Sequence, residues 1–287
     1  MFVITGATGN TGSVAAEILL KAGKKVRAVV RDAAKGSKLA KLGAELFVAD
    51  LSDQAALGRA LEGAEGVYLL SPPDLAATNF VVDRKALTEK QSRTVAAAKP
   101  GHVVLLSSIA AQHAEGTGPI QTIHNFEQQL RATGLPVSFV RAAYFVENWG
   151  AVLHPVKQDG VLPSFLPAEK KMPMVSTRDI GAAVAQALLD GPRGTRVIEL
   201  SGPVDVSPKD VAATFARLLN KPVNVVEAPL GAVVPTFTSF GISSNVAQLF
   251  QEMYGGLASG KVAWEGRDAE AKRGTISLET TLSALLG

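Results

Sequence analysis

Three glycines near the start of the chain are spaced to hold a pyrophosphate. Gly6, Gly9 and Gly12 directly follow a short apolar run and precede a helix-like pattern. Glycine allows a tight turn and lets phosphates approach the backbone, while the free N–H groups and positive dipole end of a helix attract anions. Because the pattern lies between a strand and a helix, we favour a dinucleotide site over an ordinary glycine-rich turn. The expected contacts from this loop are Gly6, Thr8, Gly9, Asn10, Thr11 and Gly12.

The residues after the second apolar run select the form of the nucleotide. An acidic side chain there binds a ribose 2′-hydroxyl, whereas an arginine pairs with a 2′-phosphate. Arg31 follows this run, Asp32 comes next, and Lys35 lies one turn on. We interpret Asp32 as the cap of the following helical turn and Arg31, supported by Lys35, as the phosphate ligand. These charges favour NADP(H) over NAD(H); the alternative is that Arg31 is a solvated surface cation.

Further cofactor contacts are expected where later apolar runs end, because ligands of parallel sheets bind at the carboxyl edge. Asp50 is placed to accept from an adenine amino group while Leu51 packs on the ring; alternatively, Asp50 belongs to a loop turn or a helix cap. The other candidates are Leu70, Ser71, Pro72, Ser107 and Ser108. Their serines also fit ordinary turns.

These side chains require a sheet of parallel strands to bring them together. Short apolar runs occupy residues 2–5, 25–30, 45–49, 66–70, 102–106 and 137–140, with helical patterns between them. This alternation predicts an α/β fold with a doubly wound parallel sheet of the Rossmann type.

The local composition of the chain changes after about residue 150, where proline and glycine become frequent. We predict a dinucleotide-binding domain over residues 1–150 and a smaller, mostly helical substrate lobe over residues 151–287. The chain is expected to return to the first domain at about 174–200, with a helix capped by Ser176 or Thr177 and a strand at 196–200. A further helix is predicted from Ser207 to about Leu219, and another over residues 278–286. Residues 231–257 read as a helix pair rich in Phe and Met, which we interpret as core in preference to a ligand cover.

Composition narrows the function classes. The 287 residues carry a net charge of only +3 with scattered cations, so we expect no nucleic-acid partner. No apolar stretch is long enough to span a membrane, and the first strand begins too early for a signal peptide, so we expect a cytoplasmic protein. The chain has no cysteine, and its four histidines are dispersed without metal-site spacing. The sequence does not decide whether two copies of the chain form a homodimer.

Several stretches together resemble the NmrA-like group of atypical short-chain dehydrogenase/reductases. They are residues 4–12, 29–32, 105–108, 139–141, 144–148, 175–180 and 200–203, with Ala142 where relatives usually have proline. Typical members of the wider superfamily carry a Tyr-x-x-x-Lys pair, in which lysine lowers the pKa of a tyrosine that protonates an alkoxide. Ile120 and His124 stand at the matching positions, so that pair is absent.

Two functions are compatible with this resemblance. In the first, the protein passes a hydride from NADPH to a quinone-like or dye-like conjugated acceptor that needs no committed acid, as in quinone and triphenylmethane reductases of this group. His124, Tyr144 and Asn148 are then the candidate catalytic residues, with Phe145 and Trp149 beside the acceptor; His124 is equally interpreted as structural, and the two aromatics as core. In the second, the protein is a non-catalytic NADP(H) sensor that controls a protein partner. We favour the reductase.

Overall fold

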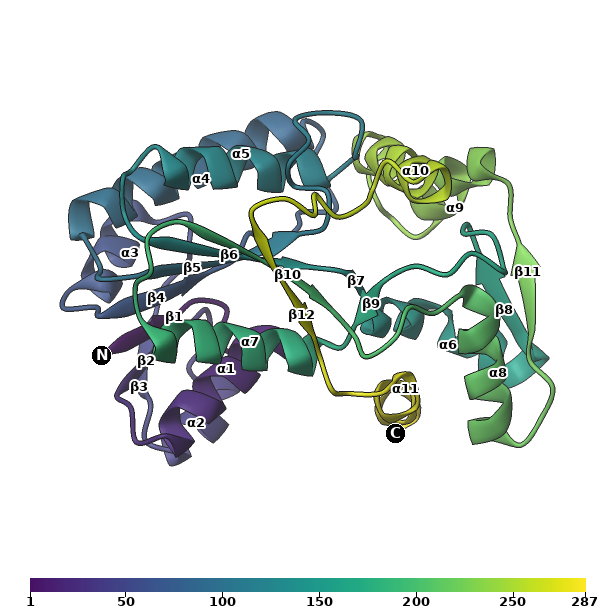
Figure 1. Cartoon of the computed structure of the whole chain (residues 1–287), viewed down its shortest axis with the longest axis horizontal. Helices are drawn as coiled ribbons and strands as arrows, with labels where there is room; N and C mark the ends of the chain where they lie inside the picture. The colour runs from purple at the N-terminus through teal and green to yellow at the C-terminus, as the bar shows by residue number, and fades with distance from the viewer.

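The computed structural model describes residues 1–287 and is built on one parallel sheet of eight strands in the order β12-β10-β6-β5-β4-β1-β2-β3 (Figure 1). Every neighbouring pair in this sheet is parallel. The strands are β1 Phe2–Ile4, β2 Val26–Val30, β3 Glu45–Val48, β4 Gly66–Leu69, β5 Val103–Ser108, β6 Val137–Ala142, β10 Arg196–Ser201 and β12 Ala269–Arg273. The predicted doubly wound α/β fold is confirmed.

Helices cover both faces of the sheet (Figure 1). One face carries α1 (Asn10–Lys21), the short η1 (Ala34–Gly36) and α2 (Ser37–Lys41), and α7 (Thr177–Asp190); the other carries α3 (Gln54–Leu61), α4 (Phe80–Ala98) and α5 (Ile120–Arg131). Each face buries its own apolar cluster. Helices α1 and α7 approach so closely that a Cβ on Gly181 would lie 2.6 Å from the Cβ of Val14. Ser176 caps α7, as predicted.

The strand order reverses at the centre of the sheet. The chain proceeds from β1 to β2 and β3 on one side, then crosses to β4, β5 and β6 on the other. Such a reversal opens a crevice at the carboxyl ends of the two strands that flank it, here β1 and β4. The glycine loop therefore lies at the position where doubly wound sheets bind their ligands.

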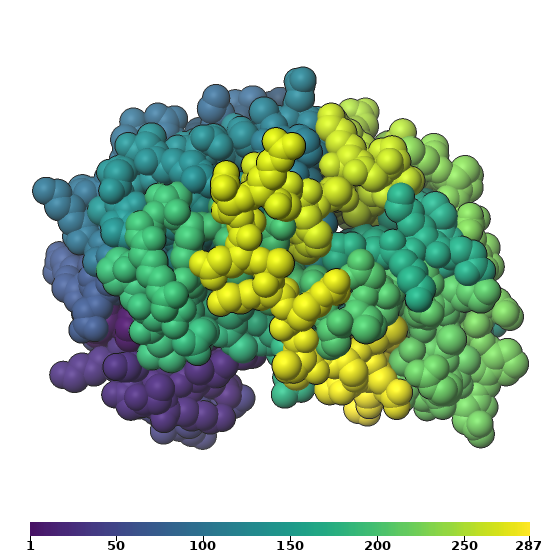
Figure 2. Space-filling model, viewed as in Figure 1, coloured from purple at the N-terminus to yellow at the C-terminus, as the bar shows by residue number.

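The second half of the chain supplies elements beside this sheet and two strands within it. Outside the sheet lie β7 (Tyr144–Phe145), η2 (Val146–Val152), α6 (Leu153–Asp159), β8 (Val161–Ser164), β9 (Met174–Val175), α8 (Pro208–Leu219), β11 (Asn224–Glu227), η3 (Leu230–Ala232), α9 (Val233–Ser239), α10 (Ser244–Ser259) and α11 (Leu278–Leu286). The predicted strand at 196–200 is β10, and the helices predicted from Ser207 and over 278–286 are α8 and α11. The C-terminal segment lies across the molecule in Figure 2. The division into two domains at about residue 150 stays a prediction.

The predicted core role of residues 231–257 holds only in part for their large side chains, and it is wrong for Phe240. Phe237, Phe250, Met253 and Tyr254 are only half-buried, and Phe240 is 76% exposed. The two helices α9 and α10 pack on each other, and their aromatic side chains meet one another. Met253 and Tyr254 also pack against the apolar cluster of the second half, and Phe250 packs against a small cluster around Phe80. No helix of the chain combines the length and apolar character that crossing a bilayer requires.

Candidate active site

The glycine loop requires its glycines for steric reasons. Gly6 has φ +56°, in the left-handed region, and the side chain of Leu70 covers it. A Cβ on Gly12 would lie 2.4 Å from the carbonyl oxygen of Gly6, a distance that no side chain tolerates. The spacing of these residues therefore follows from close backbone contacts.

The loop leaves the amino end of α1 open. Gly9 occupies the N-cap position and provides no side-chain cap. Gly9 donates its N–H to Gly6, and Ser13 donates to Gly9, but the N–H groups of the first turn between them, on residues 10–12, find no acceptor in the chain. Thr8, Gly9 and Asn10 are exposed, whereas the hydroxyl of Thr11 is buried 2.8 Å from that of Tyr68. An anion is the natural partner of such free N–H groups.

The cations predicted to bind a phosphate are available beside this loop. Arg31 and Lys35 are exposed and form no ion pair within the chain, whereas nearby Lys38 pairs with Glu17. Asp32 accepts the N–H of Ala34 at 2.9 Å, so it holds the turn as the capping interpretation requires, although Ala33 is the N-cap.

Asp50 is ionised and oriented by its own loop. Its Oδ1 accepts from the hydroxyl of Ser52 at 2.6 Å and from the Ser52 N–H at 2.7 Å. These bonds lower the pKa of Asp50, and the positive charge of Arg31 lowers it further. The other oxygen of Asp50 accepts no hydrogen bond within the chain, while Asp53 caps α3. A carboxylate at this edge is compatible with an adenine amino group.

The serines at the ends of β4 and β5 differ in their surroundings. The hydroxyl of Ser71 is buried without a partner, which marks a polar position that a ligand group would satisfy. Ser108 is half-buried. Ser107 donates instead to the buried carboxylate of Glu127 at 2.5 Å, where Arg141 also binds. The hydroxyl of Ser107 is therefore part of a buried ion network.

His124 is held by the backbone. Its Nδ1 lies 2.8 Å from the carbonyl oxygen of Ala111, so Nδ1 carries the proton and donates it. Nε2 makes no hydrogen bond within the chain. Ile120, one turn earlier on α5, is buried.

On the other side of the sheet edge, Tyr144 packs against the apolar cluster of the second half of the chain, and so does Tyr254 of α10, a residue that sequence reasoning missed. Tyr144 is half-buried with its ring 6.3 Å from that of Trp149, whereas Asn148 is exposed. Burial raises the pKa of Tyr144 well above its usual value, and Tyr254 raises it further, while Asn148 opposes the shift. Tyr254 also has a pKa raised by burial. Both phenols are therefore neutral hydrogen-bond donors at physiological pH.

The residues next to Tyr144 and Asn148 contribute to packing and to the start of α7. Glu147 accepts hydrogen bonds from Ser176 and from the backbone and hydroxyl of Thr177, so it secures the start of α7. Trp149 is buried in the apolar cluster of the second half, which supports the core alternative for this residue. Phe145 is half-buried and packs against the cluster under α1 and α7.

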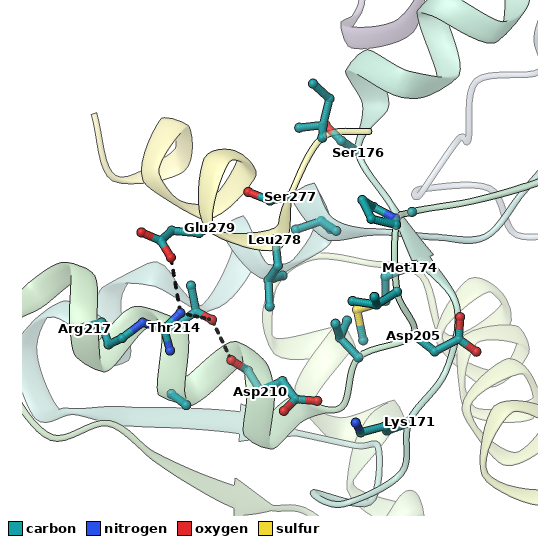
Figure 3. A pocket seen from close by; sticks show the side chains of 17 residues that line it. Lys171, Met174, Ser176, Asp205, Asp210, Thr214, Arg217, Ser277, Leu278 and Glu279 are labelled. Atoms are coloured by element: carbon teal, nitrogen blue, oxygen red, sulfur yellow. Dashed lines mark hydrogen bonds and ion pairs between the residues drawn. The ribbon is translucent and has the colours of Figure 1, made fainter. Parts of the chain in front are cut away.

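A cavity of about 530 Å³ lies elsewhere, between the end of β10, α8 and α11 (Figure 3). Most of its charged side chains are already paired. Arg217 lies 3.3 Å from Glu279, Asp205 pairs with Arg273, and Asp210 closes the capping box of α8. None of the predicted cofactor and catalytic residues lines this cavity. No group of side chains in the chain is arranged to bind a metal ion.

Comparison with known proteins decides the family. Residues 1–267 match the model of the NmrA-like family. The chain belongs to that family.

Its relatives are similar over most of their length. An NAD(P)H azoreductase from Xenophilus azovorans is 26% identical over 261 residues, which cover 88% of this chain and 86% of the azoreductase. Quinone oxidoreductase 2 of Escherichia coli is 27% identical over 270 residues, covering 91% and 89% of the two chains. The solved structure of an NADPH-dependent quinone oxidoreductase from E. coli in complex with NADPH matches all of both chains with a TM-score of 0.82 at 24% identity.

Within the NmrA-like fold, two groups of predicted residues separate in space. The glycine loop, Arg31, Lys35, Asp50 and Ser71 follow the carboxyl ends of β1, β2, β3 and β4 at one edge. Tyr144 and Asn148 lie beyond the end of β6.

Proposed function

We propose that this member of the NmrA-like family is an NADPH-dependent reductase of small quinone-like or dye-like aromatic acceptors. The observation that carries the proposal is the open first turn of α1, whose N–H groups lack acceptors, at the point where the strand order reverses. A pyrophosphate at this position would satisfy those groups and interact favourably with the helix dipole. The reductase relatives support the same conclusion.

We infer a preference for NADPH over NADH from the charges at the end of β2. Arg31 has no partner in the chain, and a guanidinium pairs well with a ribose 2′-phosphate. Lys35 would contribute a second positive charge. Asp32, the only acidic residue there, is occupied with the N–H of Ala34.

The reduced nicotinamide would supply the hydride. The residues of the chain would hold the reactants in contact and exclude water, because no Tyr-Lys pair is present to supply an acid. Ile120 fills the position of the usual tyrosine with an apolar side chain. His124, fixed through Nδ1 to Ala111, would present Nε2 to the ribose or to a proton in transit, while Tyr144 and Asn148 would line the acceptor side.

The test is NADPH oxidation followed at 340 nm with 1,4-benzoquinone, a triarylmethane dye and an azo dye. We expect turnover many-fold above the rate without enzyme for at least one acceptor. Tight NADPH binding without turnover of any acceptor would overturn the reductase proposal and favour the alternative, an NADP(H) sensor acting on a protein partner.

A further inference from the structure

Backbone contacts fix the stretch that carries Tyr144. Strand β7 pairs in parallel with β9, which places Phe145 opposite Val175. Gly202, just beyond β10, donates its N–H to the carbonyl oxygen of Met174 at 2.6 Å, and a Cβ on Gly202 would lie 2.5 Å from that oxygen. The backbone that leads out of β6 is therefore held against the backbone that leads into α7.

One carboxylate strengthens this connection. Oε1 of Glu147 accepts three hydrogen bonds from the start of α7: from the N–H of Thr177 at 2.8 Å, from its hydroxyl at 2.7 Å and from the hydroxyl of Ser176 at 3.0 Å. Oε2 is buried and makes no hydrogen bond within the chain, so a single oxygen carries the contact. Its charge also lies at the positive end of the helix dipole, where an anion is favoured. Glu147 thus holds its neighbours Tyr144 and Asn148 against one end of α7.

The same helix contacts the proposed phosphate site about one turn later. A Cβ on Gly181 would lie 2.6 Å from the Cβ of Val14 and 2.7 Å from the carbonyl oxygen of Thr11. Thr11 belongs to the first turn of α1, whose free N–H groups are the proposed ligands of the pyrophosphate. Helix α7 therefore connects the proposed acceptor side directly with the proposed cofactor helix, over about one helical turn.

Resting on the proposed function, we propose that Glu147 is a positioning residue of the reduction: through α7 it fixes Tyr144 and Asn148, and the acceptor that they would line, relative to the nucleotide on α1. Hydride transfer needs the two reacting carbons in contact, and a displacement of about 1 Å can cost roughly a hundredfold in rate. The connection consists of three hydrogen bonds, one helical turn and one close backbone contact, so it leaves little room for such a displacement.

Two substitutions separate positioning from other effects of Glu147. Glu147→Ala removes the accepting oxygen, and we expect kcat with 1,4-benzoquinone to fall about tenfold to a hundredfold. The calorimetric dissociation constant of NADPH should stay within about threefold, because the glycine loop and Arg31 are unchanged. Glu147→Gln keeps an oxygen that accepts from the same donors, and it should restore kcat to within about threefold of the wild type.

Asp210→Ala is the matched control for helix capping. Asp210 lies in the first turn of α8, where its Oδ2 accepts from the N–H and the hydroxyl of Ser207. Each alanine variant should lower Tm by about 2–4 °C, but only Glu147→Ala should lower kcat.

A double-mutant cycle tests whether Glu147 acts through α7. Thr177→Val removes one of the three donors and should lower kcat by about threefold in the wild-type background. In the Glu147→Ala background the same substitution should have no further effect, since both changes interrupt one contact.

A measurement without turnover detects the displacement itself. The ring of Trp149 lies 6.3 Å from that of Tyr144, and the only other tryptophan of the chain is Trp264. In protein labelled with 5-fluorotryptophan, with the signal of Trp149 assigned from Trp149→Phe, Glu147→Ala should shift that fluorine signal. Glu147→Gln and Asp210→Ala should leave it in place.

The outcomes separate the positioning role from the proposed function. Wild-type kcat in Glu147→Ala, an equal loss of kcat in Asp210→Ala, additive losses in the cycle or an unshifted Trp149 signal would each overturn the positioning role, while the wild type would still reduce its acceptor. Failure of the wild type to reduce any acceptor would instead overturn the proposed function.

Discussion

At the proposed cofactor edge, backbone groups from one short stretch would provide most of the contacts: the first turn of α1 offers its N–H groups, and two glycines keep side chains away from them. On the proposed acceptor side, side chains would provide the contacts, with Tyr144 and Asn148 following β6. The first region depends on space and dipoles, the second on individual polar side chains. A single added methyl group should therefore damage the first region, whereas the second should respond to the loss of a single oxygen.

The largest effect is expected from Gly12→Ala. The new Cβ would lie 2.4 Å from the carbonyl oxygen of Gly6, so either the loop or α1 must move. We expect NADPH affinity to fall at least about a hundredfold and the apo-protein to lose roughly 1–3 kcal/mol of stability. Titration calorimetry and urea unfolding measure the two effects.

The matched control is Gly58→Ala on α3, where a Cβ meets only Thr94, at 3.8 Å. This variant should bind NADPH as the wild type does. Wild-type affinity in Gly12→Ala would contradict a backbone-built phosphate site.

Arg31→Ala should have the next largest effect and tests the one side chain on which the cofactor edge depends. We expect NADPH to bind roughly 30-fold more weakly and NADH to change less than about threefold, because only NADPH carries the 2′-phosphate. Lys41→Ala, which removes another exposed cation near the end of α2, should leave both affinities unchanged. Equal losses for the two nucleotides in Arg31→Ala would refute the phosphate assignment.

A smaller effect is expected at the opposite edge of the sheet, where His102 precedes β5. Its Nε2 lies 2.9 Å from the hydroxyl of Ser138, and burial together with the charge of Arg196 lowers the pKa of His102 to about 4. A histidine in the unfolded chain has a pKa of about 6.5, so between that pH and pH 4 the unfolded chain binds a proton at His102 that the folded chain does not bind. Stability from this residue is complete above that pH and is lost as the pH falls toward 4.

His102→Gln should remove this dependence. Between pH 7 and pH 4.5 the wild type should lose about 1–2 kcal/mol more unfolding free energy than the variant, measured by urea denaturation at both pH values. NADPH affinity at pH 7 should not differ, because His102 lies away from the cofactor edge. Identical pH profiles of stability would contradict the lowered pKa.

The strands and the loop at the proposed cofactor edge could be predicted because their sequence signals are local. The apolar strands, the glycines and the capping residue Ser176 all act on neighbours a few positions away. Strand β12 was not predicted, because its residues, Ala-Glu-Ala-Lys-Arg, are mostly polar and exposed at the edge of the sheet.

The surroundings of Tyr144 were only partly predicted for a related reason. Tyr144 and Asn148 lie together in sequence, but Tyr254 joins Tyr144 against one apolar cluster only through the packing of α10, and no local pattern marks that arrangement. The large side chains of α9 and α10 were predicted to be core because Phe and Met are usually buried. In the structure Phe237 and Phe250 are half-buried and lie beside one another. Ser107 follows a strand like a ligand-binding serine, but Glu127 on α5 binds its hydroxyl.

The most direct measurement is a calorimetric titration of the purified wild-type protein with NADPH and with NADH. We expect NADPH to bind with one site per chain and at least about tenfold more tightly than NADH, since in our proposal the open turn of α1 would hold the pyrophosphate and Arg31 would hold the 2′-phosphate. The absence of binding heat with either nucleotide would contradict the assignment of this edge as a dinucleotide site, and with it the proposed reductase.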